Sequence, residues 1–310
     1  MAFLKSVWPS RARGLWRLIL VLNVTSLDAP IVAVVWFVVL TCENDHSANI
    51  FSVANRKDIA TGLVLAMTVW LIYCGDRLLD SFRSGAAVRT ARHRFSRRNW
   101  RLLLLVWTTV FGIDAVVATI YLPSAVQLFG VVLALAVGLY LLWVHAFRRR
   151  SAMQWKEPIV GILFAAGVVG AYATNAGMMN GGRGVSVGVL LAGLFTLNCW
   201  IVSRSESVWL LRVGGESVSA GHIHDRFLYV WTIGLVALSV WGLATEWLAW
   251  TLGAAVVASC IALSGLVYRM QCVTSGKASR FALLADPALI VPPMLVVGTQ
   301  LLYRSWMHVR

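Results

Sequence analysis

Two aspartates, Asp76 and Asp80, stand at the end of an apolar segment with a spacing that suits metal binding. Side chains four residues apart on a helix lie on one face, with Cβ atoms about 5–6 Å apart. Two carboxylates that close repel each other unless a cation lies between them. The preceding segment, 59–72, is apolar and long enough to cross most of a bilayer. Because acidic groups at the edge of the hydrocarbon are costly and usually functional, we expect Asp76 and Asp80 to hold Mg²⁺ at a membrane boundary.

A dense run of arginines follows these aspartates. The planar guanidinium group binds phosphate oxygens in bidentate pairs, so carboxylates beside arginines suggest a site for Mg²⁺ and a diphosphate. The alternative is a positively charged anchor that contacts anionic lipid head groups. The candidate diphosphate ligands are Arg77, Arg83, Arg89, Arg92 and Lys156.

Lys156 opens a later span that is rich in glycine. Its ammonium group could reach a phosphate, or it could simply extend to the membrane surface. Gly161, Gly167 and Gly170 would allow close helix packing or leave room for a ligand.

Another span ends in polar residues that could face the first site. Asn198 and Glu206 are eight residues apart, about two helical turns, and therefore share a face. Together with Ser203 they offer oxygen atoms, and we take Asn198 and Glu206 as candidate catalytic residues, with Glu206 as a third metal ligand. A helix that leaves the membrane often ends in polar residues, so a structural interpretation stays open.

Other acidic residues inside the spans favour structural roles. Asp28 and Asp286 each stand shortly before a proline, where a carboxylate can bind backbone groups freed by a helix break. Asp114 would lie near the middle of the membrane, with no evident partner. His222 and His224 resemble a metal pair, but no cysteine or further histidine is near them, which favours a solvated loop.

The composition indicates a membrane protein with many spans. The 310 residues are 59% hydrophobic and 13% charged, with a mean hydropathy of +0.76, which a soluble chain of this size could not bury. The net charge of +14 lies in short loops between apolar segments, so it indicates membrane orientation rather than nucleic-acid binding. Many of the fifteen tryptophans stand near span ends, which fits an interfacial belt.

We expect an all-α bundle of about nine transmembrane helices, forming a single domain over residues 1–310. A cytoplasmic N-terminus and an external C-terminus would place most of the 27 Lys and Arg residues inside; in a bacterium the membrane would be the inner one. The cytoplasmic loops 81–99 and 205–225 would then cap the active site. The expected spans are 18–41, 58–80, 100–121, 123–147, 157–178, 184–204, 226–244, 248–268 and 281–303.

This arrangement resembles the UbiA superfamily of intramembrane prenyltransferases over nearly the whole chain. Asp76 and Asp80 match the last two carboxylates of the family's first aspartate-rich motif. The run 89–94 (RTARHR) looks like the basic stretch that follows this motif, and Lys156 is similar to the family's lysine before the fifth helix.

The chain departs from the family pattern in both motifs. The leading Asn-Asp of the first motif falls at Ile72 and Tyr73, and only Asn198, Ser203 and Glu206 stand where the second motif has its aspartates. Fewer carboxylates would hold Mg²⁺ more weakly.

The resemblance implies Mg²⁺-dependent transfer of a prenyl group from a prenyl diphosphate to a lipophilic, aromatic acceptor. Trp70 and Tyr73 would then face the allylic cation through cation–π attraction. Two alternatives remain: a terpene cyclase of the same fold, and a non-catalytic bundle that binds isoprenoid lipid. The oligomeric state is open in all three.

Overall fold

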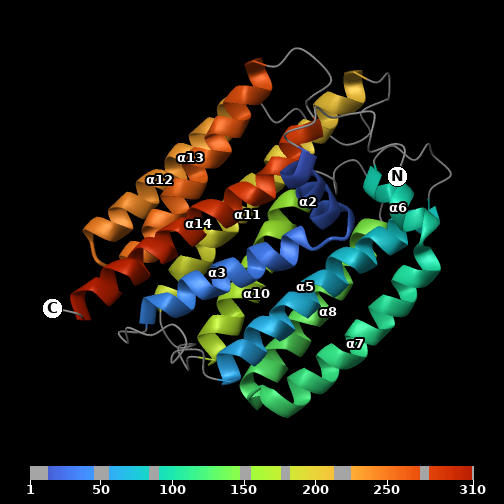
Figure 1. The fold of residues 1–310 in the computed structure, drawn as a ribbon, viewed down its shortest axis with the longest axis horizontal. Helices are drawn as coiled ribbons and strands as arrows, with labels where there is room; N and C mark the ends of the chain where they lie inside the picture. Colours follow the sequence, from blue (N-terminus) through green and yellow to red (C-terminus); the bar gives the residue numbers. More distant parts are fainter. Residues whose placement is uncertain are drawn as a thin grey trace.

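The protein is a bundle of helices, seen here in a computed structural model that describes residues 13–44, 56–83, 91–146, 155–175, 182–212, 225–272 and 279–308. The described residues form eleven helices and no strand, which confirms the expected all-α bundle (Figure 1). The helices are α2 (Arg13–Val24), α3 (Asp28–Asn44), α5 (Arg56–Arg83), α6 (Ala91–Arg98), α7 (Trp100–Tyr121), α8 (Ser124–Ala146), α10 (Lys156–Asn175), α11 (Gly182–Arg212), α12 (Asp225–Ala244), α13 (Trp250–Cys272) and α14 (Ser279–His308).

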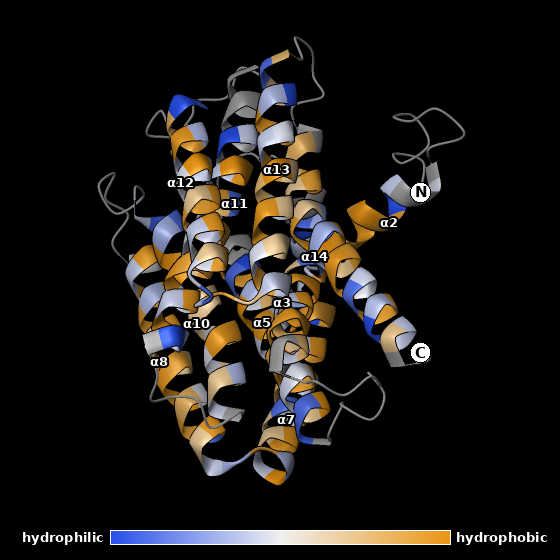
Figure 2. Ribbon diagram, turned by 90° about the vertical axis from the view of Figure 1, so that its left-hand side faces the viewer, coloured by the Kyte–Doolittle hydropathy of each residue, from blue (hydrophilic) through white to orange (hydrophobic). Residues whose placement is uncertain are grey.

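Most of these helices are built to cross a membrane. In the described part of the chain, eight are long and apolar enough, and the count is nine when α2 and α3 are taken as one broken span. All of them lie where the sequence predicts spans. Apolar residues extend along most of the helical length (Figure 2), which agrees with an integral membrane protein of many spans.

The expected span 18–41 is not one continuous helix, because α2 and α3 meet at an angle of 98°. Ser26 ends α2 in the left-handed region, with a φ of 61°. The backbone N–H of Leu27 donates to the carbonyl of Leu22 (2.8 Å), and that of Ser26 donates to Asn23 (3.3 Å). This pair of bonds is the Schellman pattern that closes helix C-termini. As a result, α2 projects sideways from the bundle (Figure 2).

The second half of the break is set by Asp28, which starts α3. Its Oδ1 accepts the backbone N–H of Ala29 at 3.0 Å, and its Oδ2 accepts the amide of Asn23 at 2.8 Å. Pro30 falls in the first turn, where a missing N–H breaks no helical hydrogen bond. The expected role of Asp28 at a helix break is therefore confirmed.

The core surrounds α3 and α11. In the apolar window of α11, 61% of the residues are buried, whereas α7 has none. Trp36 of α3 is fully buried, and its indole Nε1 donates to the carbonyl of Leu289 at 3.0 Å. That carbonyl lies four residues before Pro293, which has no N–H to donate to it. The indole therefore satisfies an acceptor that the proline leaves open.

Polar contacts mark the two ends of the bundle. At one end, Arg204 of α11 pairs with Asp225 of α12 at 3.3 Å; we call this the Asp225 end. At the opposite end, Arg183 of α11 donates from Nε to the carbonyl of Trp247 at 2.9 Å. Each expected cytoplasmic loop is partly helical: α6 lies within 81–99, and α11 continues into 205–225 as far as Arg212.

Candidate functional site

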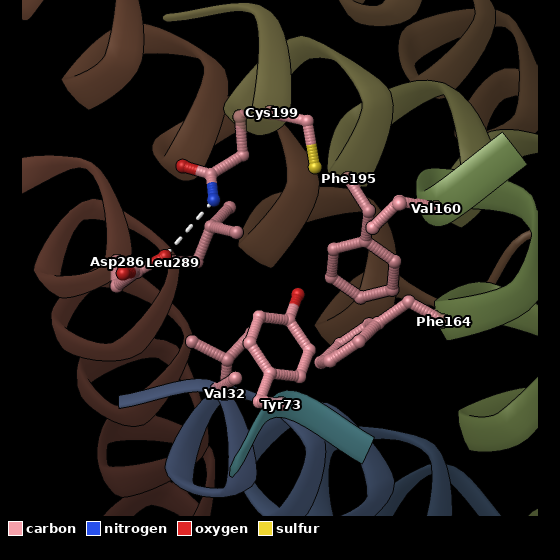
Figure 3. Close-up of a pocket in the computed structure, with 10 residues that line it drawn as sticks. Val32, Tyr73, Val160, Phe164, Phe195, Cys199, Asp286 and Leu289 are labelled. Atoms are coloured by element: carbon pink, nitrogen blue, oxygen red, sulfur yellow. Dashed lines mark hydrogen bonds between the residues drawn. The ribbon is translucent and has the colours of Figure 1, made fainter. Parts of the chain in front are cut away.

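A small cavity opens among five helices toward the Asp225 end of the bundle, between α3, α5, α10, α11 and α14 (Figure 3). It offers about 20 Å³ to the centres of water molecules, which is room for about one ordered water. Its lining residues are Ala29, Val32, Tyr73, Val160, Phe164, Phe195, Asn198, Cys199, Asp286 and Leu289.

One wall of the cavity is aromatic. The rings of Tyr73 and Phe164 stand nearly perpendicular with centroids 6.5 Å apart, and Phe164 meets Phe195 edge to face at 4.7 Å. The hydroxyl of Tyr73 points into the cavity (Figure 3). Tyr73, which the family resemblance would place against a bound cation, is thus part of the aromatic wall of this cavity.

The opposite wall is polar and joins α11 to α14. Asn198 donates from Nδ2 to Oδ1 of Asp286 at 3.0 Å, and Asp28 is close enough to the same carboxyl group to interact with it electrostatically. The Oδ1 atom of Asn198 is buried and has no hydrogen-bond partner among the described residues. The helix break expected at Asp286 is absent, because α14 continues through Pro287. Asp286 instead belongs to a polar cluster at the cavity edge.

Nothing in the sequence predicts that Asp28, Asn198 and Asp286 lie near one another. The available signal was that Asp28 and Asp286 are carboxylates within apolar spans, which are usually functional. Their interaction links positions 258 residues apart in the chain. Such a pairing depends on how the helices pack and cannot be read from local spacing.

Charged groups from α10 lie beside the cavity. Lys156 and Glu157 are close enough to Cys199 to interact with it electrostatically. Ser203 donates its hydroxyl to Oε1 of Glu157 at 2.7 Å. The first turn of α10, which includes Lys156, thus meets the end of α11 that holds Asn198 and Ser203.

The α5 residues of the predicted site divide between the cavity and the α2–α3 break. Arg77 donates from Nη1 to the carbonyls of Asn23 (2.5 Å) and Val24 (3.4 Å). Trp70 donates from Nε1 to the carbonyl of Thr25 at 3.0 Å and does not line the cavity. Both side chains therefore hold the broken helix.

The remaining predicted ligands are described only in part. Asp76 lies three residues beyond Tyr73 on α5 and is half-buried. Arg89 lies outside the described residues, as do the side chains of Asp80, Arg83, Arg92 and Glu206. Among the side chains that the structure describes, no group of three or more His, Cys, Asp or Glu could hold a metal. The fit to Mg²⁺ therefore depends on the helical spacing of Asp76 and Asp80.

Asp114, for which the sequence suggests no partner, has one. Thr68 of α5 donates its hydroxyl to Oδ2 of Asp114 at 2.9 Å. The Oδ1 atom is buried, with no hydrogen-bond partner in the described part of the chain. Asp114 therefore helps to hold α7 against α5, at a distance from the cavity cluster.

Comparison with protein-family models, curated proteins and solved structures finds no match to this chain. The functional argument therefore depends on the residues themselves.

Proposed function

We propose that the protein is an intramembrane enzyme that transfers a prenyl group from a prenyl diphosphate to a lipophilic acceptor. The observation that supports this most directly is the order of residues along α5. Tyr73 contributes to an aromatic cavity, and Asp76 follows it by about one helical turn toward the Asp225 end. Lys156 approaches the same cavity from α10. Ligands for a diphosphate would thus border a pocket for an allylic group.

The chemistry of such a transfer suits these groups. Mg²⁺ bound by Asp76 and Asp80, with Glu206 as a further ligand, would supply positive charge to the departing diphosphate. Arg77, Arg83, Arg89, Arg92 and Lys156 would add to that stabilisation. The faces of Tyr73 and neighbouring phenylalanines would attract the allylic cation.

The size of the cavity requires movement before substrate enters. The cavity has about 20 Å³ of space for water centres, which is room for about one ordered water and not for the length of a prenyl chain. The surrounding helices would therefore have to separate as substrate binds.

Two observations favour a second candidate, a non-catalytic bundle. The cavity is small, and Arg77 already binds the backbone at the α2–α3 break. A protein that kept the architecture and lost the chemistry would have both features.

Binding of farnesyl diphosphate distinguishes the two candidates. The test compares purified wild type with an Asp76→Asn/Asp80→Asn double variant, with and without Mg²⁺. The matched control is Glu246→Gln, which exchanges an exposed carboxylate beside Trp247, at the end opposite the Asp225 end. The proposal expects Mg²⁺-dependent binding in the wild type and the control, and at least about tenfold weaker binding in the double variant.

Equal binding in all three proteins would overturn the enzyme proposal in favour of the non-catalytic bundle. If binding follows the proposal, product analysis without an added acceptor separates the remaining alternatives. A cyclic hydrocarbon or alcohol indicates a cyclase, whereas unchanged diphosphate without acceptor indicates a transferase.

A further inference from the structure

The helix α2 leaves the bundle in a direction that suits the membrane surface. It meets α3 at 98°, so α2 runs nearly parallel to the plane of the bilayer that α3 crosses. Arg77 and Trp70 of α5 donate to the backbone carbonyls of Asn23 and Thr25 at the break, and the amide of Asn23 donates to Asp28. These bonds fix the direction of α2, which projects sideways from the bundle (Figure 2).

The exposed surface of α2 combines a cation with apolar side chains. Arg17 is exposed, and its helix neighbours Leu18 and Val21 are 54% and 53% exposed. Ile19 and Asn23 lie on the opposite side of the helix and are half-buried. Helices that lie in the membrane interface have this mixture, because the arginine reaches the head groups while the apolar side chains enter the acyl region.

A second basic helix lies beside α2. The helix α6 contacts α2, and the two lie near each other in the bundle (Figure 1). Ser96 of α6 is buried, whereas Arg97 and Arg98 are exposed. Because α6 ends just before Trp100, where the apolar span of α7 begins, its arginines lie at the level of the lipid head groups. Neither α2 nor α6 contains Asp or Glu.

We propose that α2 and α6 together form a surface that binds anionic phospholipid head groups of the cytoplasmic leaflet. Charge and depth both favour this partner. Arg17, Arg97 and Arg98 offer guanidinium groups that pair with phosphate oxygens, and Leu18 and Val21 offer apolar area to the acyl chains of the same lipids. None of these arginines is among the proposed diphosphate ligands, so the surface is independent of prenyl transfer.

Lipids with brominated acyl chains test this surface, because bromine quenches a nearby fluorophore. The fluorophore is attached at Val21→Cys in a Cys272→Ser background, since Cys272 is exposed. The same background without Val21→Cys controls for labelling elsewhere. The protein is reconstituted into phosphatidylcholine bilayers that contain a small fraction of brominated phosphatidylglycerol or brominated phosphatidylcholine. The two quenchers carry the same chains and differ only in the head group.

We expect the apparent affinity for phosphatidylglycerol to be at least about fivefold higher than that for phosphatidylcholine, because one arginine near an anionic lipid contributes about that factor. Arg17→Gln/Arg97→Gln should remove most of this preference. Arg17→Lys/Arg97→Lys keeps the charge and should keep the preference. The matched control Lys57→Gln/Arg183→Gln removes two exposed cations at the end opposite the Asp225 end and should leave quenching unchanged.

Equal quenching by the two lipids in the wild type would overturn the proposal. Absence of quenching by either lipid would also overturn it, because α2 would then stand in water or against a second copy of the chain. A preference that excess inorganic diphosphate removes would assign the surface to a soluble anion instead. A preference lost in the lysine variant as well would mean that the arginines hold α2 in place and do not bind lipid, which would contradict the proposal too.

Discussion

Several indole N–H groups tie neighbouring helices together through backbone carbonyls. Trp36 binds Leu289, Trp107 binds the carbonyl of Leu71 at 2.8 Å, and Trp231 binds that of Gly193 at 3.0 Å. In hydrocarbon there is no water to satisfy either group. The sequence predicts tryptophan at the membrane surface, and exposed Trp155 and others fit this. These three tryptophans have a different role, because each donates to a carbonyl on a facing helix.

Trp36 allows a direct test of the idea that its indole replaces the backbone N–H that Pro293 lacks. We expect Trp36→Phe to lower the free energy of unfolding by about 1–3 kcal/mol, because the carbonyl of Leu289 becomes a buried unpaired acceptor. In a Pro293→Ala background the new backbone N–H can bind the same carbonyl. The cost of Trp36→Phe should therefore shrink in that background, as measured by a double-mutant cycle of denaturation in detergent.

The control for this cycle is Trp250→Phe, since Trp250 is 70% exposed and should lose far less stability. An equal cost of Trp36→Phe with proline or alanine at position 293 would contradict the explanation. The indole would then stabilise through its packing alone.

At the scale of helices, the contact between α10 and α11 depends on one glycine. A Cβ at Gly161 would lie 2.6 Å from the backbone nitrogen of Thr196, which is too close for any side chain. At Gly167 on the same helix, a Cβ would meet Leu133 at 3.5 Å, an ordinary contact. The sequence predicts close packing at three glycines of this span. The structure shows it at Gly161 against α11 and at Gly170 against Phe129 of α8.

We expect Gly161→Ala to destabilise the protein by about 1–3 kcal/mol, because α10 and α11 must move apart. Gly167→Ala adds the same methyl group on the same helix, and should change stability by less than about 1 kcal/mol. Thermal denaturation in detergent measures both. Equal changes in stability for the two variants would show that helix propensity sets the effect, and that the close approach of the α10 and α11 backbones does not.

The α2–α3 break supplies a second test for this scale. Ser26 adopts a φ of 61°, a conformation that costs L-residues about 1–2 kcal/mol and glycine almost nothing. Ser26→Gly should therefore raise the free energy of unfolding by up to about 1 kcal/mol. The neighbouring Thr25→Gly, at a position without positive φ, should lower it. A loss of stability in both variants would mean that the turn depends on the Ser26 side chain.

The sequence predicts the helices better than their interruptions. Runs of apolar residues have a length fixed by the bilayer, so the spans were readable. A helix break at Asp28 was expected, but its form was not: a serine rarely ends a helix in the left-handed region, so the sequence did not predict a bend of 98° at Ser26. At Pro287 the sequence predicted a helix break that the structure does not have, since α14 continues past this residue.

For the whole molecule, the limit of sequence reasoning is the relative placement of helices. Asp76 and Asp80 share a helix face by spacing alone, and this part of the candidate site was predictable. The meeting of Asp28, Asp286 and Asn198 requires α3, α11 and α14 to be neighbours. Apolar helix faces are chemically alike, so nothing in their composition specifies that choice of partners.

The orientation of the molecule in the membrane is a prediction for this scale. Most Lys and Arg residues lie in segments that belong to the Asp225 end, which predicts that this end faces the cytoplasm. Cys272 is exposed at the end of α13 and lies there, while Glu246 is exposed at the opposite end. Two variants with a single cysteine, one with native Cys272 and one with Glu246→Cys, place a reactive thiol at either end. Labelling by a membrane-impermeant maleimide then shows which side of the membrane each end faces.

We expect Cys272 to react only in inside-out vesicles, and the cysteine at 246 only in intact cells. A variant that keeps only Cys260, which is fully buried, should react in neither preparation and controls for leakage. The reverse labelling pattern would mean that the cavity and the helix face with Asp76 and Asp80 lie on the outer side of the membrane. A diphosphate would then have to arrive from outside the cell, which would remove the cytoplasmic substrate supply that the proposed transfer requires.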